Sequence, residues 1–186
     1  MTVVNGSWAN STLLPKTGFD YVAAAWESST TCVIVGNSAR SGAILRTTNS
    51  GSSWTDQTSS TVQNLLLTDI IRYESSEENR YLITGSNSGF SASPAGYVFT
   101  SFDGVDFSYS QAISNYGLNG AAVGINGNAY VVGQVGNIYC SPVGSDWTFW
   151  VDITPKGLPQ VMLSLRCYSI SFMTCDGTCC ISCDLN

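Results

Sequence analysis

Short runs of β-branched and other apolar residues, each ending in a small residue, recur at a nearly constant interval along the chain. Their last residues are Gly36, Gly85, Gly133 and Cys183, which lie 49, 48 and 50 positions apart. The runs themselves cover residues 32–36, 81–85, 129–133 and 179–183. Self-similarity at a fixed interval of this size is typical of proteins built from repeats of one supersecondary unit. We therefore expect four related units.

Further strand-like runs surround each of these. In every unit, one strand-like run precedes the run that ends in the small residue. In the first three units, another strand-like run follows it. The preceding runs are residues 21–26, 69–73, 120–124 and 168–172, and the third runs are residues 43–46, 96–99 and 137–140. Turn sequences such as Asn126-Gly127 and Asp176-Gly177 separate the runs, and such pairs are typical of β-hairpins. The pattern predicts an all-β fold with three strands and a closing turn in each unit.

The closing turns of the first three units end in an aromatic residue. Residues 47–54 match the Asp-box pattern of Ser/Thr, any, Asp/Asn, any, Gly, any, any, Trp at every defined position. Residues 101–107 are one position shorter and have Phe in place of Trp, and residues 141–147 lack the acidic residue. Because these copies occur in the same phase of the repeat, the chain resembles the Asp-box (BNR) β-propellers over nearly its whole length. We expect residues 1–186 to form a single propeller domain.

The resemblance gives the turn residues a structural role. The third-position side chain accepts hydrogen bonds from turn amides, the glycine adopts a positive φ, and the aromatic residue packs between strands. We expect these roles, including those of a reduced box at the N-terminus, for Asn49, Gly51, Trp54, Asp103, Gly104, Phe107, Gly144, Trp147, Gly6 and Trp8.

The two ends of the sequence are complementary in the repeat. The fourth unit stops after its second strand, whereas residues 2–8 read as a short strand followed by the reduced box. We therefore predict a four-bladed propeller whose last blade is completed by the N-terminal strand, which would remove exposed sheet edges. A segment of a larger propeller, or a strand that completes a neighbouring chain's blade, is the alternative.

Composition and charge exclude several classes of partner. The formal net charge is -6, the isoelectric point is near 4.3, and lysine occurs only at Lys16 and Lys156. Nucleic acids and anionic membrane surfaces require a basic surface, and no apolar run is long enough to span a membrane. Other protein chains, glycans and further copies of the chain are the expected partners. Because histidine is absent, the commonest zinc ligand and general base are missing, and we expect no cofactor or metal.

Cysteine usage favours an extracellular or cell-surface location. The chain has seven cysteines and two N-glycosylation acceptor sequences, at Asn5 and Asn10, although a cytosolic protein with free thiols is the alternative. Cys180 and Cys183 have C-x-x-C spacing, but alternation along a strand places them on opposite faces, which disfavours a single metal ion. We expect structural disulfides, with buried thiols as the alternative. The candidates are Cys167, Cys175, Cys179, Cys180 and Cys183.

Catalytic and sugar-binding interpretations are weaker than a structural one. A sialidase-like site needs converging arginines, and only Arg72 lies within a predicted inner strand. A glycosidase could use two carboxylates, and lectin-like binding could use exposed aromatic rings. The candidate acids are Asp20, Asp69, Asp103, Asp106 and Asp152, and the candidate aromatics are Trp26, Tyr116, Trp147, Phe149 and Trp150.

The leading hypothesis is a noncatalytic extracellular structural or interaction module that can assemble into a larger structure. The alternatives are a carbohydrate-active enzyme, sialidase-like or glucan hydrolase-like, and a lectin-like module.

Overall fold

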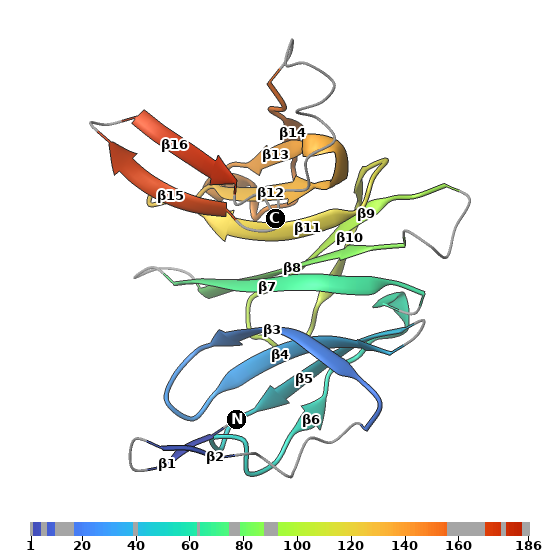
Figure 1. Cartoon of the computed structure of the whole chain (residues 1–186), viewed down its shortest axis with the longest axis vertical. Coiled ribbons are helices and arrows are strands. Elements are labelled where there is room, and N and C mark those ends of the chain that lie inside the picture. The colour runs from blue at the N-terminus through green and yellow to red at the C-terminus, as the bar shows by residue number, and fades with distance from the viewer. Residues whose placement is uncertain are drawn as a thin grey trace.

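Three four-stranded antiparallel sheets and two separate two-stranded sheets make up the protein (Figure 1). The computed structural model describes residues 2–4, 7–9, 17–38, 41–62, 64–74, 79–87, 93–155, 170–175 and 178–183. Sheet 1 contains β3 (Asp20–Trp26), β4 (Cys32–Ser38), β5 (Ser41–Thr47) and β6 (Thr55–Asp56). Sheet 2 contains β7 (Leu66–Glu74), β8 (Asn79–Ser86), β9 (Gly96–Ser101) and β10 (Ser108–Ser114). Sheet 3 contains β11 (Leu118–Val123), β12 (Ala129–Gly133), β13 (Ile138–Ser141) and β14 (Val151–Asp152).

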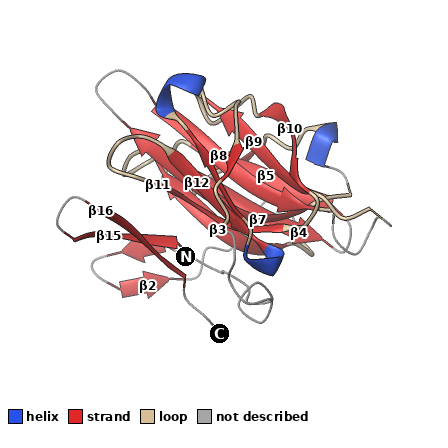
Figure 2. Cartoon of the chain, turned by 90° about the horizontal axis from the view of Figure 1, so that it is seen from above, coloured by secondary structure: helices blue, strands red, loops and turns tan. Residues whose placement is uncertain are grey.

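The remaining elements are small. β1 (Thr2–Val4) pairs with β2 (Ser7–Ala9), and β15 (Ile170–Cys175) pairs with β16 (Thr178–Cys183). Short 3-10 turns occur at Ser60–Val62, Gln134–Gly136 and Val143–Ser145, and Figure 2 shows that the rest of the described structure is strand and loop. The all-β prediction is confirmed.

Each four-stranded sheet is one sequence repeat, with its strands paired in chain order. The predicted runs lie within or overlap the first three strands of each sheet, as expected from their alternating apolar residues. A fourth strand, not predicted from the sequence, follows each closing turn. β6 and β14 each contain two residues, too few to show a hydrophobic pattern. The longer β10 pairs with β9 through two register shifts, which interrupt its alternation.

The first strands of the sheets lie side by side. β7 contacts both β3 and β11, and β15 contacts β11, so these strands form a row through the molecule (Figure 1). Side chains tie the row together: the Asn37 amide accepts the Leu67 N–H and donates to the Leu67 carbonyl, both at 2.7 Å. The Asp69 carboxylate accepts the Ala121 N–H at 2.9 Å. These contacts hold each sheet against the next, as in the blades of a propeller.

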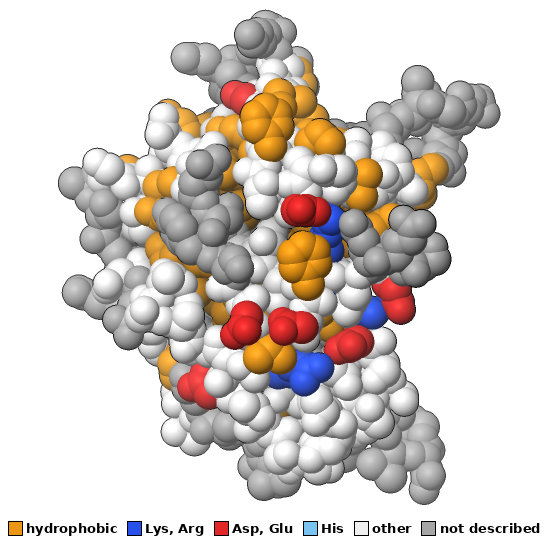
Figure 3. Space-filling view, turned by 180° about the vertical axis from the view of Figure 1, so that it is seen from behind, with side chains coloured by type: hydrophobic (Ala, Val, Ile, Leu, Met, Phe, Trp, Pro, Cys, Tyr) orange, Lys and Arg blue, Asp and Glu red, His pale blue; other side chains and the backbone are white. Residues whose placement is uncertain are grey.

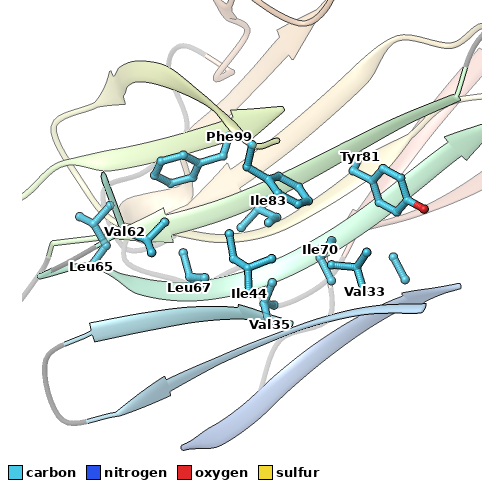
Figure 4. Close-up of a cluster of buried hydrophobic side chains, with 12 residues drawn as sticks. Val33, Val35, Ile44, Val62, Leu65, Leu67, Ile70, Tyr81, Ile83 and Phe99 are labelled. Carbon is cyan, nitrogen blue, oxygen red and sulfur yellow. The ribbon is translucent and has the colours of Figure 1, made fainter. Parts of the chain in front are cut away.

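Two hydrophobic cores fill the spaces between sheets. The first joins sheets 1 and 2, and Figure 4 shows its side chains pointing toward one another from the two sheets. The second joins sheets 2 and 3 and contains Leu82, Val98, Val131 and the fully buried Trp147. Because each core lies between two sheets, adjacent repeats are stabilised by each other's apolar faces.

The terminal strands differ from the sequence prediction. β1 pairs with β2 and does not lie in the sheet of β15 and β16, and Figure 1 shows the two hairpins at opposite ends of the long axis. The register Val4↔Ser7 leaves Asn5 and Gly6 between the two strands. Completion of the fourth blade by the N-terminal strand is therefore not confirmed.

Several predicted cysteine and glycan sites are not tested by the structure. Cys32 is a buried free thiol and Cys140 a partly buried one. Cys175, Cys179, Cys180 and Cys183 lie on β15 and β16, where only the backbone is described, and Thr174 pairs with Cys179. Outside the described residues lie Asn5, Gly6, Asn10 and Cys167. Over the part of the chain that the structure describes, no helix has the length and apolar character needed to cross a membrane.

Candidate interaction surface

The first closing turn is organised by two side chains at its start. The Thr47 hydroxyl accepts the N–H groups of Asn49 and Gly51 at 3.3 and 3.0 Å. The Asn49 side-chain oxygen in turn accepts the Ser53 N–H at 2.8 Å. Gly51 has a φ of 82°, a conformation that glycine adopts without a steric penalty. These contacts satisfy turn amides that the sheet leaves unpaired.

The second closing turn repeats this arrangement with an acid in place of the amide. The Ser101 hydroxyl accepts the N–H groups of Asp103 and Gly104 at 3.3 and 2.9 Å. The Asp103 carboxylate accepts those of Val105 and Asp106 at 2.8 and 3.1 Å. Desolvation acts to raise the pKa of Asp103, but these N–H groups outweigh it and hold the pKa below its usual value. Gly104 has a φ of 68°.

The third closing turn has a different backbone. Gly144 does not adopt a positive φ, whereas Asp146 and Trp147 do, at 54° and 55°. A short 3-10 turn, Val143–Ser145, takes the place of the box, and the Ser141 and Ser145 hydroxyls hydrogen-bond at 2.9 Å. The role expected of Gly144 is therefore wrong. The turn has no acid at the position of Asp103, so its amides are satisfied in another way.

Aromatic residues of the second and third turns pack between sheets. Phe107 belongs to the core of sheets 1 and 2 and meets Tyr81 edge to face, with ring centroids 6.3 Å apart. Trp147 belongs to the core of sheets 2 and 3, and its indole N–H donates to the Gly127 carbonyl at 3.2 Å. Each ring thus lies between its own sheet and the sheet before it. Trp54 holds the same position in sheet 1 and is only partly buried.

Ion pairs within sheets 1 and 2 lie near these turns, and one of their carboxylates also links the two sheets. Glu27 accepts a hydrogen bond from Arg46 of its own sheet at 3.3 Å and one from the Tyr81 hydroxyl of sheet 2 at 3.1 Å. Burial is the larger cause and the neighbouring Glu27 carboxylate the smaller cause that together raise the pKa of Tyr81 to about 12. Arg72 pairs with Glu74 at 2.9 Å.

Arg80 makes the corresponding connection between sheets 2 and 3. Its side chain is 2% exposed and pairs with the Asp146 carboxylate. The guanidinium also donates to the Val143 carbonyl at 3.0 Å and lies 5.2 Å from the ring centroid of Phe102 and 5.6 Å from that of Trp147. It is therefore fixed in place by charged, polar and aromatic contacts at once.

The end of the sheets that carries the three closing turns is here named the turn face. Large apolar side chains are exposed on it, with Trp26 58%, Phe102 59% and Ile125 87% accessible. The described basic residues are Arg46, Arg72 and Arg80, and Figure 3 shows basic and acidic side chains close to exposed hydrophobic ones on one face. Each of these arginines is paired with a carboxylate. Exposed carboxylates of this face, such as Asp103 and Asp106, thus outnumber the basic groups available to a partner.

Three of the five candidate glycosidase acids make structural contacts. Asp69 binds the backbone N–H groups of Ile70 and Ala121, and burial raises its pKa. Asp103 is held in its turn, and Asp152 accepts the Thr154 N–H at 2.8 Å. Asp20 and Asp106 are exposed. Within the described ranges, no group of three or more His, Cys, Asp or Glu side chains is placed to hold a metal ion.

The candidate sugar-binding aromatics are dispersed. Trp147 is fully buried and cannot contact a glycan, and the partly buried Trp150 donates its indole N–H to the Trp147 carbonyl at 3.0 Å. Trp26, Tyr116 and Phe149 are exposed. Tyr116 precedes β11, at the end of the sheets opposite the turn face. The exposure of Phe102 could not be predicted from the sequence, because the Asp-box pattern does not define whether that turn position faces the core or solvent.

Comparison with known proteins identifies the fold of the chain but does not assign the chain to a family. No family model matches the chain, and no curated protein matches it. Among solved structures, the chain is similar to one described as YCF48 bound to D1 peptide, with 15% sequence identity and a TM-score of 0.51. The match covers 76% of this chain and 44% of that chain, so this chain spans less than half the length of its structural neighbour. YCF48 is a β-propeller, and the likeness, together with the three repeated sheets, shows a propeller fold.

Proposed function

We propose that this chain is a noncatalytic interaction module, an Asp-box propeller that binds protein partners through its turn face at an extracellular or cell-surface location. The matching hydrogen bonds of the first two closing turns support the Asp-box assignment. The cysteine content and glycosylation sequences support the location. Four blades, or a part of a larger propeller, both agree with the three sheets and the additional hairpin.

The exposed ring of Phe102 is the observation that carries the proposed binding role. Arg80 underlies the ring, and the guanidinium is itself held by Asp146 and the Val143 carbonyl. An aromatic side chain that is exposed yet preorganised loses little freedom on binding, which favours affinity. The surrounding carboxylates select a segment that carries both apolar and basic side chains. The structurally similar YCF48 is bound to a peptide, which supports a peptide segment as the class of partner.

Binding of defined peptides tests this proposal. The probes are a fluorescent peptide of alternating leucine and arginine and a counterpart of alternating leucine and glutamate, measured by anisotropy. We expect the basic peptide to bind more tightly, with an affinity that falls as salt increases. Phe102→Ser should weaken it by on the order of tenfold. Tyr116→Ser is the matched control, because that exposed ring lies at the opposite end. Equal binding of both peptides, or an unchanged affinity for Phe102→Ser, would overturn the proposal.

Glycan binding is the second candidate function, favoured by the exposed rings of Trp26 and Phe149, which are 58% and 61% accessible. Aromatic faces stack on sugar rings through apolar and C–H contacts. A glycan array combined with hydrolysis assays on sialosides and β-glucans separates the alternatives. Specific glycan binding lost in Trp26→Ser would favour a lectin-like module, and turnover would show an enzyme.

A further inference from the structure

In sheets 2 and 3, the same cross-strand row of three residues faces the preceding sheet, as the strand register shows. In sheet 2, the cross-strand row Ile70, Ile83 and Phe99 faces sheet 1 and is buried. In sheet 3, the equivalent row Ala121, Val131 and Tyr139 faces sheet 2. Each sheet therefore covers the sheet before it with the same three positions.

Sheet 1 presents the same row with no four-stranded sheet before it among the described residues; the two-stranded sheet of β1 and β2 is the described element at that end of the molecule (Figure 1). The equivalent positions are Ala24, Ile34 and Leu45. Ala24 is exposed and Ile34 partly buried, although Leu45 is covered. Trp26, on the same side of β3, is 58% exposed. An exposed tryptophan beside apolar positions is unusual unless the surface is an interface.

The opposite end of the molecule presents the complementary row. In sheet 3, Ala122, Tyr130, Cys140 and Val151 pair across the four strands, on the face turned away from sheet 2. The hairpin of β15 and β16 lies along β11 at the inner end of this row. Val151 nevertheless remains 43% exposed, and Ile153 just beyond it 40%. In sheet 1 the residues facing the next sheet, such as Val35 and Ile44, are fully buried.

We infer that the chain associates head to tail with a second copy, the sheet 1 end of one copy docking on the sheet 3 end of the other. Inside the chain, each equivalent row is covered by a neighbouring sheet of the same chain. A second copy carries the same sheets, so its shape and apolar pattern match the uncovered rows. The contact is heterologous, so it extends to rings or filaments according to the rotation between copies. This inference goes beyond the binding role of the turn face.

Light scattering of two single variants and their mixture tests the arrangement. Trp26→Asp places a charge at the sheet 1 end, and Val151→Asp at the sheet 3 end. Both residues are exposed, so both variants should retain the fold, as circular dichroism will verify. We expect the mass of the natural chain to rise with concentration and each variant alone to stay monomeric.

The equimolar mixture is the decisive measurement. Trp26→Asp retains an intact sheet 3 end and Val151→Asp an intact sheet 1 end, so together they form one natural interface and should give dimers. Tyr116→Asp, a control at an exposed aromatic outside both rows, should associate like the natural chain. A natural chain that is monomeric at every concentration, variants that still associate, or a mixture that stays monomeric would each overturn the inference.

Discussion

Arg80 shows how one buried charge can hold two repeats together. Its contacts are with the backbone and carboxylate of the third closing turn and with two aromatic rings. A charge removed from water needs several such partners to offset its desolvation. This residue was not singled out in the sequence, because nothing in a strand pattern distinguishes a buried arginine from an exposed one.

Replacing Arg80 by alanine should lower the free energy of unfolding by about 2–4 kcal/mol, because it leaves a cavity and removes the hydrogen bonds of the buried guanidinium to the Val143 carbonyl and the Asp146 carboxylate. Arg72→Ala is the comparison variant: its ion pair with the 65% exposed Glu74 contributes at most about 1 kcal/mol, and its hydrogen bond to the Asn79 side chain at 2.7 Å about 1 kcal/mol more. Urea unfolding followed by tryptophan fluorescence measures both. Equal losses for the two variants would contradict the role assigned to Arg80.

Asp69 should make stability depend on pH. Burial raises its pKa in the folded protein above the ordinary 3.8, so folding favours the protonated acid. Its contribution to stability is therefore greatest below the unfolded-state pKa and is lost as pH rises through the folded-state pKa. Asp69→Asn keeps an oxygen to accept the Ala121 N–H and removes this titration. The unfolding free energy of the natural chain relative to Asp69→Asn should increase as pH is lowered from 7 to 3. A pH-independent difference would show that Asp69 does not titrate in this way.

At the scale of the element, the closing turns combine a shared hydrogen-bond pattern with unequal surroundings. Gly51 and Gly104 have similar positive φ angles. A Cβ on Gly51 would lie 3.7 Å from the Trp54 ring, whereas on Gly104 it would lie 3.1 Å from Tyr81 and 3.2 Å from Val33. The second turn is therefore pressed against sheet 1, and the first is not.

Gly104→Ala should consequently be more destabilising than Gly51→Ala. Both changes carry the backbone penalty of a positive φ, about 1 kcal/mol, and only Gly104→Ala adds overpacking of about 1–3 kcal/mol. Thermal unfolding of the two variants side by side provides the comparison. A Gly51→Ala variant that is as unstable as Gly104→Ala would show that the crowding has no effect.

The elements also show what the sequence could predict. Apolar alternation predicted the first three strands of every sheet, and the turn pattern located the three closing turns. Of the fourth strands, β6 and β14 were missed because each has only two residues, and β10 because register shifts interrupt its alternation. The third turn could not be foreseen either, since the positive φ of Asp146 and Trp147 accompanies the contacts of Arg80 with that turn. Phe102 lay within a predicted turn, but its exposure follows from tertiary packing.

At the scale of the whole molecule, stability depends on cores shared by neighbouring sheets. Trp147 is fully buried between sheets 2 and 3 and contacts the ring of Tyr73, with centroids 6.1 Å apart. Trp147→Ala should therefore cost about 3–5 kcal/mol and loosen sheet 3 from sheet 2. Hydrogen exchange should show lost protection on both sides of that interface, in β8 and β12. Loss confined to sheet 3 would mean that the sheets are stable independently.

Each sheet is assembled from consecutive strands, and this has a consequence during synthesis. The strands of a sheet can begin to pair as soon as its own stretch of about 50 residues leaves the ribosome, but the sheet is stabilised only when a neighbouring sheet covers its apolar face. Its apolar face toward the next repeat then remains open until another such stretch has emerged, about 3–10 seconds later at ordinary elongation rates. During synthesis, the most recently formed sheet of the nascent chain therefore always exposes an apolar face. Chaperones that bind exposed apolar strands could bind such a face once per repeat before the chain is released.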